Sequence, residues 1–136
     1  MGNMIATYIG IYSGAADTVC PKEFAPSSYT REAAEAKEGR YYLAANNTKI
    51  PIYGRKTVTG ITDDWNGFSF EAEVADVKRP LASVCKICEA GNRVVFEQGS
   101  SYIENLKTGK RTNIEETGTG YRIKVWLPHF QGQGNP

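Results

Sequence analysis

The sequence predicts a single, mostly β domain with one or two short helices. Its 136 residues suit one domain with one hydrophobic core. Val, Ile, Thr, Tyr and Phe recur in short runs, and 14 glycines are distributed through the chain. Strands of this length with so few helices are typical of a small closed or partly closed barrel.

The first elements are a strand, a loop and a helix. Residues 5–12 predict a strand because apolar residues recur along them. Residues 21–28 predict a loop, since they contain two prolines. Residues 30–38 are rich in Ala and Glu and predict a short helix that starts at Thr30 as N-cap and ends at Gly39.

A hairpin and a further strand follow. Residues 40–45 and 49–53 predict two strands joined by the turn Asn46-Asn47-Thr48, because Asn tolerates positive φ. Residues 56–61 predict the next strand, which ends before a polar turn over 63–67 that contains Asn-Gly.

Residues 68–77 predict a strand with one apolar face, because Phe68, Phe70, Ala72 and Val74 alternate with polar residues. Apolar and small residues over 81–90 recur at helical spacing and predict a short helix.

The last third predicts strands only. A strand over 93–97 precedes a second hairpin, formed by 102–106 and 111–114, and the final strand covers 120–127. Residues 131–136 are rich in Gly and Gln and predict a flexible C-terminal linker, so the folded domain is expected to cover 1–130.

Composition and charge exclude several function classes. The net charge of +1 gives no electrostatic reason to expect nucleic acid or a membrane surface as a partner, and no apolar run approaches the length of a membrane span. The three cysteines are an odd number and no secretory signal pattern precedes them. We therefore expect reduced thiols and a cytoplasmic location, with neither a metal nor a cofactor.

The strand over 5–12 leads into a turn of small residues, Ser13-Gly14-Ala15. The chain resembles the retropepsin-like aspartic protease domain of copia-type retrotransposon Pol polyproteins in three ordered segments. Residues 12–19 are similar to the Asp-Ser-Gly-Ala loop of that family, with Tyr12 at the position of the aspartate. Residues 43–54 are similar to its Leu-Ala-Asn/Asp-Gly-x-x-Ile-Pro-x-x-Gly hairpin, with Asn47 replacing the glycine. The third match, over 77–105, contains a Pro-Leu-Ala-Ser-Val run followed by Gly-x-x-Val-x-Phe.

The resemblance implies a small closed retropepsin-like barrel that pairs with a second copy about a two-fold axis. Each chain would donate one catalytic loop, here Tyr12, Ser13 and Gly14, and the hydroxyl of Ser13 would brace the two loops. Ala15 and Asp17 would contact a peptide or polyprotein segment in the groove. Asn46, Asn47 and Thr48 would form the tip of a flap that closes over this substrate. The run Leu81–Val84 would lie behind the loop and hold it.

Tyr12 removes the acid that this chemistry requires. Two carboxyls in contact share a proton, and one of them acts as base towards a water molecule. A phenol has an ordinary pKa of about 10 against about 4 for a carboxyl, so it is a neutral donor near pH 7. We therefore expect no aspartic endopeptidase activity, and a residual role in dimerisation or peptide binding.

Other interpretations fit the same residues. The chain is an active aspartic endopeptidase if its aspartate was replaced by Tyr12, or a non-enzymatic binding domain if Tyr12 serves packing or ligand contact. A third alternative, a thiol redox protein, depends on the C-x-x-C formed by Cys85 and Cys88. Core packing is the favoured interpretation of these two cysteines, because Cys on a short helix is usually buried. His129 is expected at the surface.

Overall fold

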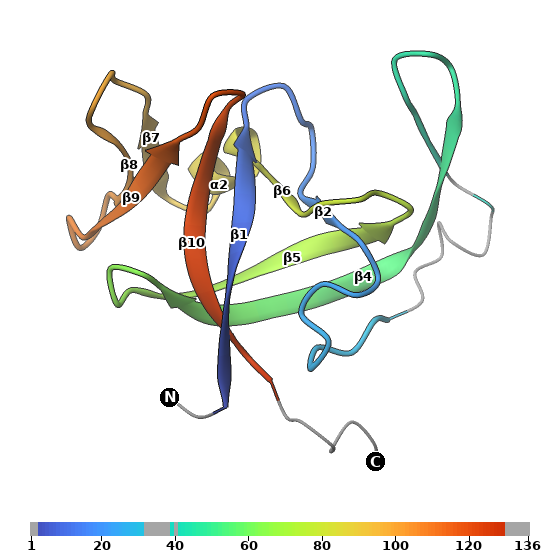
Figure 1. The fold of residues 1–136 in the computed structure, drawn as a ribbon, viewed down its shortest axis with the longest axis horizontal. Helices are drawn as coiled ribbons and strands as arrows, with labels where there is room; N and C mark the ends of the chain where they lie inside the picture. Colours follow the sequence, from blue (N-terminus) through green and yellow to red (C-terminus); the bar gives the residue numbers. More distant parts are fainter. Residues whose placement is uncertain (1–2, 32–38, 40, 130–136) are drawn as a thin grey trace.

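A computed structural model describes residues 3–31, 39 and 41–129 of the chain. These residues form β-strands and one short helix, so the predicted mostly β class is confirmed (Figure 1). The elements are β1 Met4–Tyr12, β2 Val19–Cys20, β3 Tyr41–Leu43, β4 Lys49–Thr62, β5 Gly67–Ala75, β6 Leu81–Ser83, α2 Val84–Glu89, β7 Asn92–Val95, β8 Ser101–Asn105, β9 Arg111–Glu116 and β10 Tyr121–Pro128. The predicted helix over 30–38 falls mainly on residues 32–38, which lie outside the described part.

The strands pair in the order β3-β4-β5-β2-β6-β1-β10-β9-β8-β7. β1 and β10 are antiparallel from Met4↔Pro128 to Ile11↔Tyr121 and lie side by side in Figure 1. β10 also pairs with β4 at Val125↔Thr62 and Trp126↔Ile61. The last strand is therefore bonded both to the first strand and to the long central one.

The core is formed by one face of each long strand. On β5 the predicted alternation is present, with Ala72 and Val74 buried and Phe68 and Phe70 half-buried against the core. Glu73 departs from the polar face, since it is only 5% exposed. The core residues are Ile9, Ile11, Cys20, Phe24, Ala25, Val58, Ala72, Val74, Ala82, Ile114, Ile123, Val125 and Leu127.

The two strands predicted over 49–53 and 56–61 are one continuous strand, β4. The register against β5 shifts between Ile52 and Gly54, so the irregularity is a bulge rather than a break. Arg31 bonds across this point, donating its N–H to the Arg55 carbonyl at 2.7 Å and accepting the Arg55 N–H at 2.9 Å. A Cβ at Gly54 would clash with the Arg31 carbonyl, which explains why glycine stands there.

The helix predicted over 81–90 is wrong in its first turn, because Leu81–Ser83 form the strand β6. Ser83 is the N-cap of α2, and its Oγ accepts the Lys86 N–H at 3.2 Å. The helix thus begins at Val84, and Val84 and Ile87 pack against the core. The predicted strands of the last third are present as β7 to β10 with shifted ends.

Candidate functional site

The loop that follows β1 is exposed at its start and anchored at its end. Tyr12 is 55% exposed, and Ser13 and Gly14 are also exposed. Asp17 accepts the Thr18 N–H on Oδ1 at 2.8 Å, which closes the turn back into β2. The predicted catalytic loop therefore presents Tyr12, Ser13 and Gly14 to solvent in the single chain.

β6 holds this loop from behind. It runs parallel to β1, with Tyr12 opposite Ser83. The fully buried Ser83 donates its hydroxyl to the Ala15 carbonyl at 2.7 Å, and its N–H donates to Thr18 Oγ1 at 3.0 Å. The same Ser83 oxygen caps α2. One serine therefore connects both halves of the loop to the start of the helix.

Tyr12 lies over a small hollow rather than in the core. The hollow has a volume of about 300 Å³ and is lined also by Ile11, Ser13 and Gly14 and by two aromatic residues, Phe96 and Tyr121. The rings of Phe96 and Tyr121 are in contact, with centroids 4.5 Å apart. Tyr12 fills no interior space in the single chain, so its phenol is open to a partner or a ligand.

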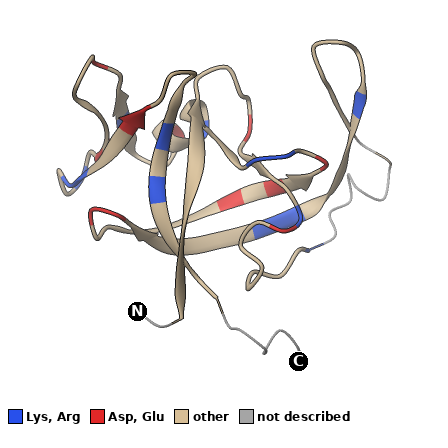
Figure 2. Cartoon of the chain, in the orientation of Figure 1, with Lys and Arg blue, Asp and Glu red and all other residues tan. Residues whose placement is uncertain are grey.

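Charged residues connect the end of the loop to the sheet. Arg55 on β4 lies 3.5 Å from Asp17, 3.4 Å from Glu73 and 3.9 Å from Glu71, measured between nitrogen and carboxylate oxygen. Figure 2 shows acidic segments of β5, in red, beside a basic segment of β4, in blue. Hydrogen bonds from Thr57 and from Arg31 lower the pKa of Glu71, so this carboxylate stays charged at neutral pH.

The predicted hairpin is confirmed as β3 and β4, with Tyr42 opposite Ile50. Asn47 has a φ of 66°, and its N–H donates to the Ala44 carbonyl at 2.9 Å. The hairpin extends away from the body of the domain (Figure 1). Within the described residues, no hydrogen bond or ion pair joins Asn46, Asn47 or Thr48 to the loop after β1.

The hairpin and the loop are connected indirectly. Tyr42 on β3 donates its hydroxyl to Glu73, and Glu73 pairs with Arg55, which pairs with Asp17. Sequence patterns do not predict that Arg55 and Glu73 belong to this cluster. The two residues come close to Asp17 only when β2 pairs with β5, which depends on the folded topology. The buried position of Glu73 on an otherwise polar face is the feature that marks it in the structure.

Cys85 and Cys88 are exposed, so the prediction that they pack in the core is wrong. The reason is the start of α2 at Val84, which turns Val84 and Ile87 inward and the two cysteines outward. A hydrogen bond to Glu89 raises the pKa of the Cys85 thiol, which lowers its reactivity and argues against redox chemistry. In the described part of the chain, no three His, Cys, Asp or Glu residues gather in a way that could hold a metal ion.

The three thiols are expected to react with iodoacetamide in a fixed order. Burial raises the pKa of Cys20 to about 11, so at pH 8 the native protein should be alkylated at Cys85 and Cys88 while Cys20 reacts only after unfolding. Glu89→Gln should accelerate alkylation of Cys85, and Glu97→Gln should not. Mass spectrometry of timed samples measures each rate, and alkylation of native Cys20 as fast as Cys85 would contradict this placement.

Three acidic residues, Asp63, Asp64 and Glu115, have structural partners. Asp63 accepts the Trp126 indole N–H at 3.1 Å, and Asp64 accepts the Asn113 N–H at 2.6 Å. Glu115 pairs with Arg122. His129, which is half-buried rather than fully at the surface, donates its backbone N–H to the Asn3 carbonyl at 2.7 Å.

The fold and the site define a small β-rich domain whose first long strand ends in an exposed Tyr-Ser-Gly loop, held from behind by a parallel strand. Comparison with protein-family models, with curated proteins and with solved structures finds no match. Among the described residues, no helix has the length and apolar character needed to cross a membrane.

Proposed function

We propose that this chain is a retropepsin-like domain of the copia retrotransposon type, in which Tyr12 replaces the catalytic aspartate and abolishes acid–base catalysis. Its remaining capacity is to form a homodimer and to bind a peptide or polyprotein segment. The observation that carries the proposal is the parallel pairing of Tyr12 with Ser83, because a held strand-end loop is the part of the fold on which the family's chemistry depends.

The strand pairings support a small closed barrel. β4 pairs with β5, β5 with β2, β2 with β6, and β6 with β1. β1 pairs with β10, which pairs again with β4. This succession of pairings returns to its starting strand, as closure of a barrel requires.

The position of the hairpin supports a flap. The Asn46-Asn47-Thr48 tip is exposed and, within the described part of the chain, has no hydrogen bond or ion pair to the loop after β1. The base is connected through Tyr42 to the Glu73 and Arg55 cluster beside Asp17. A hairpin anchored at its base and unbound at its tip can close over a peptide and exclude water. Ala15 and Asp17 then lie along the edge of the groove.

The exposed loop supports pairing with a second copy. A single chain leaves Tyr12, Ser13 and Gly14 open, next to the contacting rings of Phe96 and Tyr121. Aromatic residues exposed together are typical of interfaces. The same exposure favours a non-enzymatic binding domain as a second candidate function, since it leaves the phenol available for contact.

Restoring the acid tests the proposal. Tyr12→Asp should cleave a fluorogenic peptide library at mildly acidic pH and should be inhibited by a statine peptide. The wild type and Tyr12→Asn should remain silent, because neither supplies a carboxylate. A general acid–base group typically raises the reaction rate by roughly 10²–10⁴-fold, so the difference in cleavage rate between Tyr12→Asp and the other two proteins should be measurable.

Sedimentation of each variant separates the outcomes. A folded and dimeric Tyr12→Asp that cleaves no peptide would contradict the retropepsin proposal, and a folded monomer would contradict the paired site. Statine-sensitive cleavage by the wild type would contradict the role of Tyr12 as an inactivating residue. A dimeric wild type that binds the statine peptide without cleaving substrate is the expected result.

A further inference from the structure

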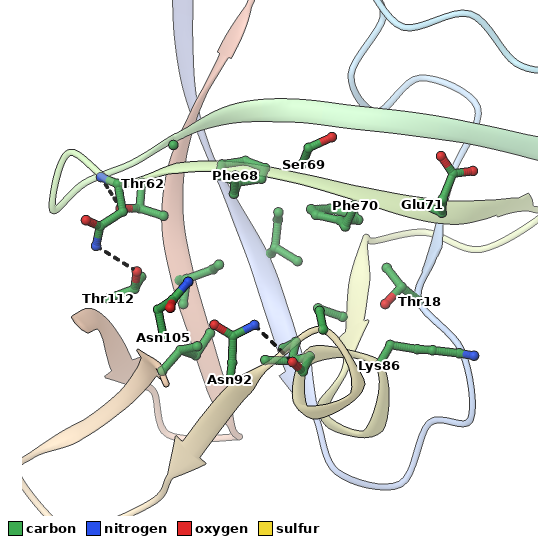
Figure 3. Close-up of a pocket in the computed structure, with 18 of the residues that line it drawn as sticks. Thr18, Thr62, Phe68, Ser69, Phe70, Glu71, Lys86, Asn92, Asn105 and Thr112 are labelled. Carbon is green, nitrogen blue, oxygen red and sulfur yellow. Dashed lines mark hydrogen bonds between the residues drawn. The ribbon is translucent and has the colours of Figure 1, made fainter. Parts of the chain in front are cut away.

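A cavity of about 600 Å³ lies between the β4–β5 hairpin and the segment formed by α2 and β7 to β9 (Figure 3). Phe68 and Phe70 form one wall, and Ile87 and Ile103 belong to the opposite side. Ile9 and Ile123 contribute from β1 and β10. Tyr12, Ser13 and Gly14 are not among its lining residues, whereas Asp17 and Thr18 at the end of the loop are.

The size of this cavity is unusual for a domain of 136 residues. Protein interiors are close-packed and have few voids larger than a water molecule. Its volume falls within the range of about 300–1,000 Å³ that small-molecule sites occupy. The rings of Phe68 and Phe70 are stacked, with centroids 5.6 Å apart, and present a continuous apolar surface to it. The volume and the paired rings suit a ligand with an apolar part.

Several polar side chains at the cavity already form hydrogen bonds with other groups of the protein. Asn66 donates its amide to the Arg111 carbonyl at 2.9 Å and to Thr112 Oγ1 at 3.2 Å. Asn92 donates to the Ile87 carbonyl at 3.0 Å, as the dashed line in Figure 3 marks. Asn105 accepts two backbone N–H groups of the β8–β9 turn. These hydrogen bonds hold the three side chains in place at the wall of the cavity.

The basic residues at the cavity differ in whether an acidic residue pairs with them. Arg55 is bonded to Asp17 and Glu71, and Lys86 lies 3.5 Å from Glu89. Lys110, an exposed residue in the β8–β9 turn, also lines the cavity, and among the described residues no ion pair joins its side chain to a carboxylate. An anionic group at this end would gain an ion pair without breaking an existing one.

We propose that this cavity binds an amphipathic carboxylate of the size of a medium-chain fatty acid. The apolar chain lies between the Phe68 and Phe70 rings and the Ile87 and Ile103 side chains. The carboxylate lies beside Lys110. This site shares Asp17 and Thr18 with the end of the loop after β1 but does not include Tyr12, Ser13 or Gly14, so binding there requires neither dimerisation nor a catalytic acid.

Titration calorimetry with dodecanoate below its micellar concentration tests the proposal. Dodecanoate should bind the full chain at one site per chain and raise the midpoint of thermal unfolding. Ile103→Trp fills the cavity and should abolish binding. Lys110→Glu should weaken dodecanoate binding at least tenfold, while Lys107→Glu, the same charge change in the same turn but outside the cavity lining, should change it little. Dodecanol should bind equally well to the wild type and to Lys110→Glu.

Each other outcome would overturn part or all of the proposal. No heat of binding, or a lowered unfolding midpoint, would contradict a built site. Retained binding in a folded Ile103→Trp would place the ligand elsewhere. If Ile103→Trp does not fold, the comparison of Lys110→Glu with Lys107→Glu tests the proposal. Equal effects of these two substitutions on dodecanoate binding would show only a general effect of charge, and would contradict the position assigned to the carboxylate.

Discussion

Gly60→Ala is expected to destabilise the domain by about 3 kcal/mol or more, because the new methyl group has no room on either side. A Cβ at Gly60 would lie 2.5 Å from the Trp126 carbonyl oxygen, 2.8 Å from Leu127 Cδ2 and 2.9 Å from Phe68 Cζ. The first of these is backbone and cannot move without separating β4 from β10 where Trp126 pairs with Ile61. Urea denaturation followed by circular dichroism measures the change.

Gly67→Ala is the matched control for Gly60→Ala. Gly67 opens β5 in the same hairpin, and a Cβ there would meet nothing within 4 Å. Its unfolding free energy should change by less than about 0.5 kcal/mol, in the range usual for surface substitutions. Equal effects of the two substitutions would show that the close approach of β4 to β10 at Gly60 is wrong, and the barrel proposed from that pairing would lose its last link.

The two hairpins are predictable from the sequence because their turns carry local signals. Asn47 adopts the positive φ that its side chain tolerates, and Gly109 does the same in the second turn at 75°. The error over residues 81–90 has a local cause as well. Ser83 is a good N-cap residue before Val84, and with Pro80 preceding the run this capping signal favours a helix that starts three residues later than periodicity alone predicts.

The candidate site, like the fold, can be predicted only in part from local sequence signals. The exposed turn of Tyr12, Ser13 and Gly14 follows from a strand that runs into small residues. The connections that hold it do not, because Ser83 meets Ala15 across 68 positions of the chain. Such contacts depend on which strands become neighbours, and hydrophobic periodicity carries no information on that choice. The ion pair of Asp17 with Arg55 is hidden from sequence patterns for the same reason.

Lys56→Met is expected to destabilise the domain by about 2–4 kcal/mol. Lys56 is only 1% exposed although it lies on β4, and its ammonium group donates to the carbonyls of Lys22, Phe24 and Ala25 at 3.4, 2.7 and 3.4 Å. Methionine keeps the length of the side chain but has no donors, and each buried carbonyl left without one costs about 1–3 kcal/mol. Burial lowers the pKa of Lys56, so removing the charge returns part of this cost.

The loss should be local as well as global, because Lys56 connects the loop over 21–28 to the sheet. Trypsin should cleave after Lys22 faster in Lys56→Met than in the wild type under native conditions, since the carbonyls that fix this loop lose their donor. Lys49→Met, on the same strand but exposed, should change neither the stability nor the cleavage. A Lys56→Met protein as stable as the wild type, with an equally protected loop, would mean that the desolvation cost of the ammonium group cancels the gain from its three hydrogen bonds. Lys56 would then add no net stability, and it would not be the residue that positions the segment between Cys20 and the sheet.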